Sequence, residues 1–210
     1  MIKKHKWTLL VGSIVILLPI LAGLLLWNRL PEQIPTHWGP TGEVDGWSSK
    51  GFAVIGLPAI VLALHWICVL ATYLDPKNKN QNKKAMTLVL WICPVITVLL
   101  STLTLGSALG WQPNVSMIMP VLMGILFMVI GNYLPKCTSN YTIGIKIPWT
   151  LNSEVNWNKT HRFAGWLWTV SGIAIMLSGI FGGFKIFLIV VFLMIFAPII
   201  YSYILYRKGT

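Results

Sequence analysis

Long apolar runs separated by short polar segments set the pattern of hydrophobic and polar positions along this chain. A helix needs roughly 20 apolar residues to cross the ~30 Å hydrocarbon layer of a membrane, and its backbone groups are then satisfied within the helix. Runs of this length predict an all-α polytopic membrane protein with six transmembrane helices. We place these helices at residues 7–27, 51–74, 85–109, 115–134, 163–181 and 186–206.

The composition supports this class of protein. Of the 210 residues, 56% are hydrophobic and only 10% are charged, a balance that excludes an ordinary soluble domain. The formal net charge of +11 is also compatible with nucleic-acid binding, but the basic residues lie in the loops between the apolar runs. Their distribution therefore indicates membrane topology, and we expect no direct contact with nucleic acid.

Basic residues are strongly unequal between the two sides of the predicted membrane. If the N-terminus is inside, thirteen of the sixteen lysines and arginines fall on the inner side, and Arg29, Lys50 and Lys185 fall on the outer side. Because cytoplasmic loops carry an excess of basic residues, we predict that both termini are cytoplasmic. The loop at residues 28–50 then faces outward, and the segment at residues 131–162 faces the cytoplasm.

The outer loop at residues 28–50 is predicted to be ordered, since its prolines and glycines favour a compact reversal. It carries three of the five acidic residues of the chain, next to histidine and tryptophan, so it could bind a cationic or amphipathic ligand. The candidate residues are His37, Trp38, Gly39, Gly42, Glu43, Asp45 and Gly46. The alternative is an interfacial anchor whose carboxylates are simply solvated. One histidine with scattered carboxylates lacks the spacing of a zinc site, so no metal is predicted.

His65 is the ionisable side chain that falls near the middle of a predicted helix. A histidine inside the membrane is a candidate functional residue, because placing polar groups there is costly. The alternative is structural, since a neutral imidazole can donate a hydrogen bond to a neighbouring helix.

The segment at residues 131–162 has a residue choice that neither solvation nor membrane burial explains. Gly144 and Pro148 predict a turn of defined shape, and Glu154 fits the first turn of a short interfacial helix near residues 151–162. The candidate residues of this segment are Asn132, Tyr141, Gly144, Lys146, Pro148, Trp149, Thr150, Trp157, Thr160, His161 and Arg162.

Three motifs in this segment carry a resemblance to a known family. They read G-N-Y-L-P-K from Gly131, N-Y-T-I-G-I-K-I-P-W-T-L from Asn140 and W-N-K-T-H-R from Trp157. In this order they resemble the signature of the SdpI family, bacterial integral membrane proteins that give immunity to a secreted toxin. A second stretch, Leu30–Lys50, is similar to a loop of the small membrane domain of unknown function that usually precedes the SdpI region.

The resemblance implies an N-terminal membrane region at residues 1–110 and an SdpI-like region at residues 111–210. It implies an immunity protein of the bacterial plasma membrane that protects the producing cell from a secreted peptide toxin. In the family's best-known system, the protein also holds a small DNA-binding autorepressor at the membrane. The outer loop would then sense the toxin and the inner segment would capture the repressor. The partners are thus the lipid bilayer, the toxin and the autorepressor, with no cofactor.

Two other classes of function stay open at the level of sequence. A transporter of a toxic or lipid-like compound needs polar groups at mid-membrane, where His65 alone qualifies clearly. A membrane enzyme could use His161 and Arg162 with Asn132 or Tyr141 on a phosphate or acyl group. A nucleophile–base pair and a metal motif are both missing from the sequence, so we expect a protein that is not an enzyme.

Overall fold

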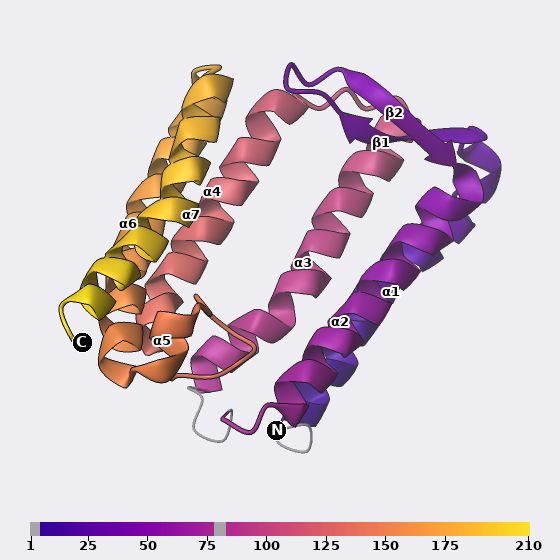
Figure 1. Ribbon diagram of the computed structural model, residues 1–210. Helices are drawn as coiled ribbons and strands as arrows, with labels where there is room; N and C mark the ends of the chain where they lie inside the picture. Colours follow the sequence, from indigo (N-terminus) through magenta and orange to yellow (C-terminus); the bar gives the residue numbers. More distant parts are fainter. Residues whose placement is uncertain (1–4, 78–82) are drawn as a thin grey trace. The chain divides into compact units, whose positions relative to one another are not determined.

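The computed structural model describes residues 5–77 and 83–210, most of which are helical (Figure 1). The long helices are α1 (Lys6–Leu25), α2 (Leu57–Leu74), α3 (Lys83–Ala108), α4 (Val115–Tyr133), α6 (Glu154–Ile180) and α7 (Phe184–Arg207). The short elements are η2 (Trp27–Arg29), β1 (Gln33–Trp38), β2 (Val44–Ser49), the π-helical turn η3 (Phe52–Gly56), η5 (Leu134–Lys136) and α5 (Pro148–Asn152). Within the described residues, six helical segments are long and apolar enough to cross a membrane, which confirms the predicted fold class.

The outward faces of the long helices are covered by large apolar side chains. Leu25 of α1, Ile67 of α2 and Ile189 of α7 are 79%, 62% and 61% exposed. In water, such continuous apolar faces would drive aggregation, whereas in a bilayer they contact hydrocarbon. The chain is therefore a multi-pass membrane protein. Lys3, Lys4 and Lys79, which contribute to the predicted charge asymmetry, lie outside the described residues.

The first compact unit consists of residues 1–73 and 86–115. Its buried apolar cluster gathers residues from the hairpin, α3 and the start of the second membrane span: Leu30, Ile34, Ala53, Val54 and Leu105. Glycine lets α1 approach this cluster closely, because a Cβ on Gly23 would lie 2.5 Å from a methyl group of Val54. Nearer the start of α1, the Ser13 hydroxyl accepts a 3.2 Å hydrogen bond from the Trp66 indole of α2.

An antiparallel β-hairpin follows α1, where we predicted a compact loop. Strand β1 pairs with β2 in the register Gln33 with Ser49 and Trp38 with Val44, with an irregularity between them. Proline is tolerated in a strand whose edge is free, which is why Pro35 did not prevent strand formation. The turn is closed by a 2.9 Å hydrogen bond from the Gly39 amide to the Glu43 carbonyl oxygen, and Gly42 adopts a φ of +86°. The outer loop is thus ordered, but it is built from strands that the sequence pattern did not reveal.

The second compact unit consists of residues 74–85 and 116–210 and contains α4, α5, α6 and α7. Helices α6 and α7 form the predicted hairpin, with Gly182 at a φ of +73° in the turn. The compact units divide the chain near residue 115, whereas the proposed division near residue 110 rests on the resemblance and stays a prediction.

Helices α4 and α6 are antiparallel and meet along glycines spaced seven residues apart. A Cβ on Gly172 would lie 2.5 Å from the Gly124 carbonyl oxygen, and one on Gly165 would lie 2.7 Å from that of Gly131. Small residues of this kind let membrane helices pack backbone to backbone. Phe127 and Trp168 add an edge-on aromatic contact between the same helices, with centroids 5.6 Å apart.

The structure places the short helix earlier than we expected. It is α5 at Pro148–Asn152, with proline at its first turn, and residues 154–162 are instead the first turns of α6. The Ser153 hydroxyl caps α6 by accepting from the Asn156 amide, and Glu154 follows in the first turn. Helix α6 thus begins nine residues before Phe163, where we had expected the fifth membrane helix to begin, because side chains on one face of this polar stretch are buried within the protein.

Candidate functional site

The loop between η5 and α5 is shaped by the buried side chain of Asn140. Its amide nitrogen donates to the carbonyl oxygens of Thr138 and Ile143, both at 2.8 Å. Its oxygen accepts from the backbone amides of Thr142 and Ile143, at 2.8 and 2.6 Å. One asparagine therefore holds both sides of the turn, a role that we did not assign to it from the sequence. The signal that could have revealed it is the tendency of asparagine to bond the backbone two residues ahead.

Thr150 fixes the end of the same loop. Its hydroxyl accepts from the Ile147 amide at 3.1 Å and donates to the Ile145 carbonyl oxygen at 2.7 Å. The side chain is fully buried, and Pro148 starts the helical turn that carries it. The predicted turn of defined shape around residues 143–150 is therefore present.

His161 and Trp157 form a buried stacked pair beneath this loop, with ring centroids 3.9 Å apart. The imidazole Nε2 accepts from the Ile145 amide at 3.0 Å, so Nδ1 carries the proton and donates to the Trp157 carbonyl oxygen at 2.8 Å. The Trp157 indole donates to the Cys137 carbonyl oxygen at 2.8 Å. Gly144, at a φ of +113°, lies so close to both rings that a Cβ would collide with them. Both imidazole nitrogens are thus engaged in holding the loop.

Burial raises the pKa of the Cys137 thiol, which is therefore protonated at neutral pH. The thiol contacts the Tyr133 carbonyl oxygen at 3.6 Å, as expected of a structural cysteine.

A second buried network joins the start of α6 to α7. The Asn156 amide nitrogen donates to the Ser202 carbonyl oxygen at 3.0 Å, and the Ser202 hydroxyl donates back to the Asn156 oxygen at 2.6 Å. The Thr160 hydroxyl donates to that same oxygen at 3.0 Å. All three side chains are fully buried. We predicted Thr160 as a site residue but missed Asn156 and Ser202, although a lone serine within apolar α7 could have drawn attention.

The predicted residues of the inner segment thus separate into a buried frame and an exposed face. The buried members are Thr150, Trp157, Thr160 and His161. The exposed members are Asn132, Tyr141, Lys146, Pro148 and Arg162. Gly144 and Trp149 are half-buried. Trp149 packs against the rings of Tyr203 and Tyr206 in α7, at centroid distances of 5.0 and 6.1 Å.

Asp75, directly after α2, contacts this segment although it begins a polar, basic stretch that is typical of a solvated loop. One carboxylate oxygen accepts from the Tyr141 amide at 2.8 Å and the Thr142 hydroxyl at 3.0 Å. The other accepts from the Lys77 amide at 2.9 Å. The Lys77 ammonium group lies 4.8 Å from the centroid of the Tyr141 ring and donates to the Leu151 carbonyl oxygen at 3.4 Å.

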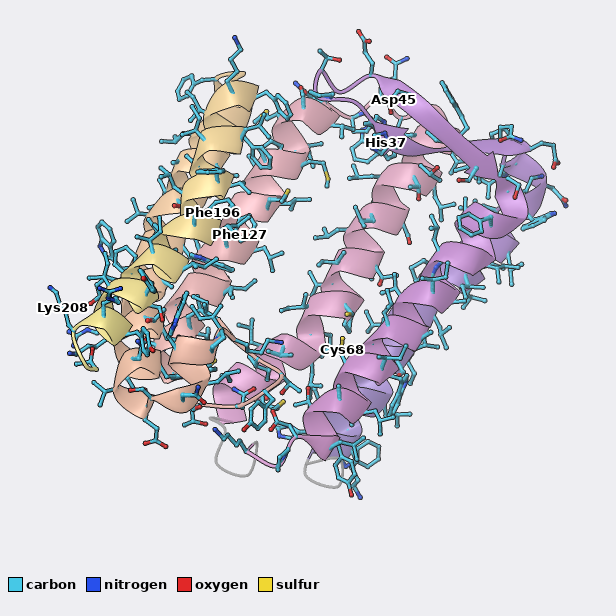
Figure 2. All side chains as sticks on the ribbon, viewed as in Figure 1. His37, Asp45, Cys68, Phe127, Phe196 and Lys208 are labelled. Atoms are coloured by element: carbon cyan, nitrogen blue, oxygen red, sulfur yellow. The ribbon has the colours of Figure 1, made fainter. Side chains whose placement is uncertain are left out.

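On the hairpin, the structure brings His37 and Asp45 together as a hydrogen-bonded pair (Figure 2). Their side chains are 71% and 51% exposed, and Glu43 is exposed as well. The three candidate glycines, Gly39, Gly42 and Gly46, lie in or beside the turn, and Gly46 packs against the Cβ of His37. The Trp38 side chain is half-buried. Across residues 5–77 and 83–210, no group of three or more metal-binding side chains is placed to hold a metal ion.

His65 lies within α2 and is 2% exposed. Its Nε2 has no hydrogen-bond partner among the residues that the structure describes, so the interhelical hydrogen bond that we considered for it is not formed by that atom.

The fold and these clusters define a multi-pass helical membrane protein whose buried polar contacts gather at the start of α6, in the loop before it and on α7. Residues 136–202 match the SdpI/YfhL protein family, and residues 14–62 match the Domain of unknown function (DUF1648). Over 205 residues the chain is 29% identical to the Immunity protein SdpI of Bacillus subtilis (strain 168), covering 95% of this chain and 96% of that protein. No solved structure matches the chain at a significant level. The chain thus resembles the SdpI family over residues 136–202 and this domain over residues 14–62, and the predicted resemblance is confirmed.

Proposed function

We propose that this chain is an immunity protein that resides in a bacterial plasma membrane and protects the cell from a secreted peptide toxin. The observation that carries the proposal is the 29% identity to Immunity protein SdpI, which extends over 95% of the chain. The family matches fall in both halves, at residues 14–62 and 136–202, so the likeness is not confined to one region.

The distribution of basic residues supports an orientation with both termini in the cytoplasm. Thirteen of the sixteen lysines and arginines then lie on the inner side. Because each membrane crossing reverses the side, the hairpin between α1 and α2 faces outward and the loop between α4 and α6 faces the cytoplasm.

The hairpin is the proposed contact for the toxin. Glu43 and Asp45 are exposed, and Trp47 beside them is 57% exposed. Carboxylates next to an exposed aromatic ring suit a cationic or amphipathic peptide. The pairing of His37 with Asp45 holds one carboxylate on a defined edge of the turn.

The inner face is the proposed surface for an autorepressor. Tyr141 and Lys146 are exposed on a loop whose backbone is held by buried side chains, and Arg162 is exposed on α6. A receptor that reports toxin to the cytoplasm needs such a surface on the side opposite to the toxin.

The hydrogen bonds of His161 favour this function over an enzyme. A general base needs a free lone pair near its substrate, but Nε2 is occupied by the Ile145 amide and Nδ1 by the Trp157 carbonyl. Transport is the second candidate, favoured by His65 inside a membrane span, whose buried Nε2 has no partner in the described part of the chain. Proton-dependent flux in liposomes that is abolished by His65→Ala would establish it.

Survival of a toxin-sensitive bacterium tests the immunity proposal. Cells express the wild type, the double variant Glu43→Gln and Asp45→Asn, or the control Glu154→Gln, which neutralises an exposed carboxylate outside the hairpin. At matched membrane abundance and with the purified secreted peptide toxin of an SdpI-family system, we expect the wild type and the control to protect. Loss of protection in the double variant supports the toxin contact, whereas full protection refutes it. A wild type that fails to protect refutes immunity to this toxin.

A further inference from the structure

Asp75 is the buried carboxylate of this protein, at 8% exposure, whereas the other four acidic residues are exposed. Burying a carboxylate is costly unless hydrogen bonds replace its water, and here three donors do so. Two of the donors belong to the signature loop at residues 138–147, through Tyr141 and Thr142. A solvated turn has no need of such a costly arrangement, so a positioning role explains it better.

Lys77, two residues after Asp75, contacts both the signature loop and α5, the helix that follows the loop. Lys77 donates to the Leu151 carbonyl oxygen and lies over the Tyr141 ring. Asn140 and His161, by contrast, fasten the loop to itself and to α6. The contacts of Asp75 and Lys77 therefore join this part of the protein to the described residues that directly follow α2.

Asp75 directly follows a helical run that ends at Leu74, and the start of that run is bonded to residues next to the hairpin. Strand β2 ends at Ser49, and helical conformation runs without a break from Lys50 to Leu74. The Lys50 amide donates to the Glu32 carbonyl oxygen at 2.9 Å, and its ammonium group lies 2.9 Å from the Glu32 carboxylate. The ammonium group also lies 5.2 Å from the Trp27 ring centroid. One continuous helical run thus has the hairpin at its first residue and Asp75 immediately after its last.

We propose that this helical run couples the two surfaces: ligand binding at the hairpin is transmitted through α2, and Asp75 is the residue that passes it to the signature loop. The ligand at the hairpin rests on the proposed function, while the mechanical link rests on the contacts of Lys50 and Asp75. If a toxin binds one conformation of the hairpin more tightly than the other, that difference in affinity shifts the population of loop conformations by the same free energy.

Hydrogen exchange of the full-length protein in lipid nanodiscs tests the coupling. The readout is the exchange rate of residues 138–147, with and without the same purified peptide toxin, and toxin binding is measured in parallel. Asp75→Asn replaces an acceptor oxygen with an amide group, and we expect about tenfold faster exchange at Tyr141. Thr142→Ser, which keeps the hydroxyl, and Glu154→Gln, which neutralises an exposed carboxylate, are the controls and should match the wild type.

The deciding result is the response to toxin. We expect toxin to change exchange of the loop in the wild type and both controls, and to bind the Asp75→Asn protein without changing it. A merely structural role of Asp75 would not abolish the response while binding persists. An unchanged response in Asp75→Asn, or toxin binding to the wild type without a response, overturns the coupling and leaves immunity intact.

A second arm needs no toxin and separates the coupling from the proposed function. Lys50→Met removes the ammonium contacts at the start of the helical run. We expect this substitution to change loop exchange in the protein that has Asp75 and to add nothing in the Asp75→Asn protein. Additive effects, or no effect of Lys50→Met on the loop, refute the coupling even if the toxin proves to be a different one.

Discussion

The Asn156 network offers a sharp test of how this protein is held together. Asn156→Ala removes two hydrogen bonds between α6 and α7, those exchanged with Ser202. Interhelical hydrogen bonds in membranes contribute roughly 0.6 to 1.7 kcal/mol each, so we expect a loss of about 1 to 3 kcal/mol in the free energy of unfolding. Ser202→Ala removes only the hydroxyl bond and should cost about 1 kcal/mol.

The double variant distinguishes a network from independent contacts. Once Asn156 is alanine, the Ser202 hydroxyl has already lost its acceptor, so removing it adds little. We therefore expect the double variant to resemble Asn156→Ala, with a coupling energy of about 1 kcal/mol. Reversible unfolding by dodecyl sulfate in mixed micelles measures these free energies. Asn158→Ala, at an exposed asparagine of the same helix, is the matched control and should have almost no effect.

Either of two results would contradict this reasoning. If the free energy of unfolding of Asn156→Ala lies within about 0.5 kcal/mol of the wild-type value, the network does not stabilise the helix pair. If the two single substitutions add in the double variant, Asn156 and Ser202 do not act through their mutual hydrogen bonds.

Two further substitutions test the close approaches made by glycine. Gly144→Ala should destabilise the signature loop by about 1 to 3 kcal/mol, because its positive φ is strained for alanine and its Cβ meets Trp157 and His161. Faster hydrogen exchange at residues 138–147 with α6 unchanged is the expected result, and unchanged exchange would show that the loop tolerates the methyl group. Gly172→Ala should separate α4 from α6 and cost about 1 to 3 kcal/mol, since its Cβ would lie 2.5 Å from the Gly124 carbonyl oxygen. Wild-type resistance to dodecyl sulfate in that variant would mean that the helices do not pack through this glycine.

The membrane spans were predictable because long apolar runs have few other stable structures. The start of α6 was not, since Asn156, Trp157, Thr160 and His161 read as polar interfacial positions when solvent or lipid is the assumed surrounding. In the structure their partners come from α7, from the preceding loop and from α6 itself, so the polar groups are satisfied inside the protein. Hydropathy describes transfer into lipid and carries no information about such internal partners.

The hairpin and Asp75 were missed for a related reason. Prolines and glycines at residues 31–46 indicate chain reversal, but strand pairing across them depends on which residues face each other after folding. Asp75 lies in a basic, polar stretch that is typical of a solvated loop, and its donors come from residues 141 and 142. The signature itself was recognisable, yet its division into a buried frame and an exposed face required the coordinates.

The seven-residue spacing of glycines along α4 and α6 restricts how this part of the protein can respond to a ligand. Gly124 faces Gly172 and Gly131 faces Gly165, and the next register that pairs glycine with glycine lies seven residues away, a slide of about 10 Å. A smaller displacement of α4 along α6 would place a larger side chain of one helix against the backbone of the other, where only glycine fits. The two helices therefore behave as a fixed platform under the signature loop, and movement of the loop must arise from segments that join this platform from elsewhere in the chain.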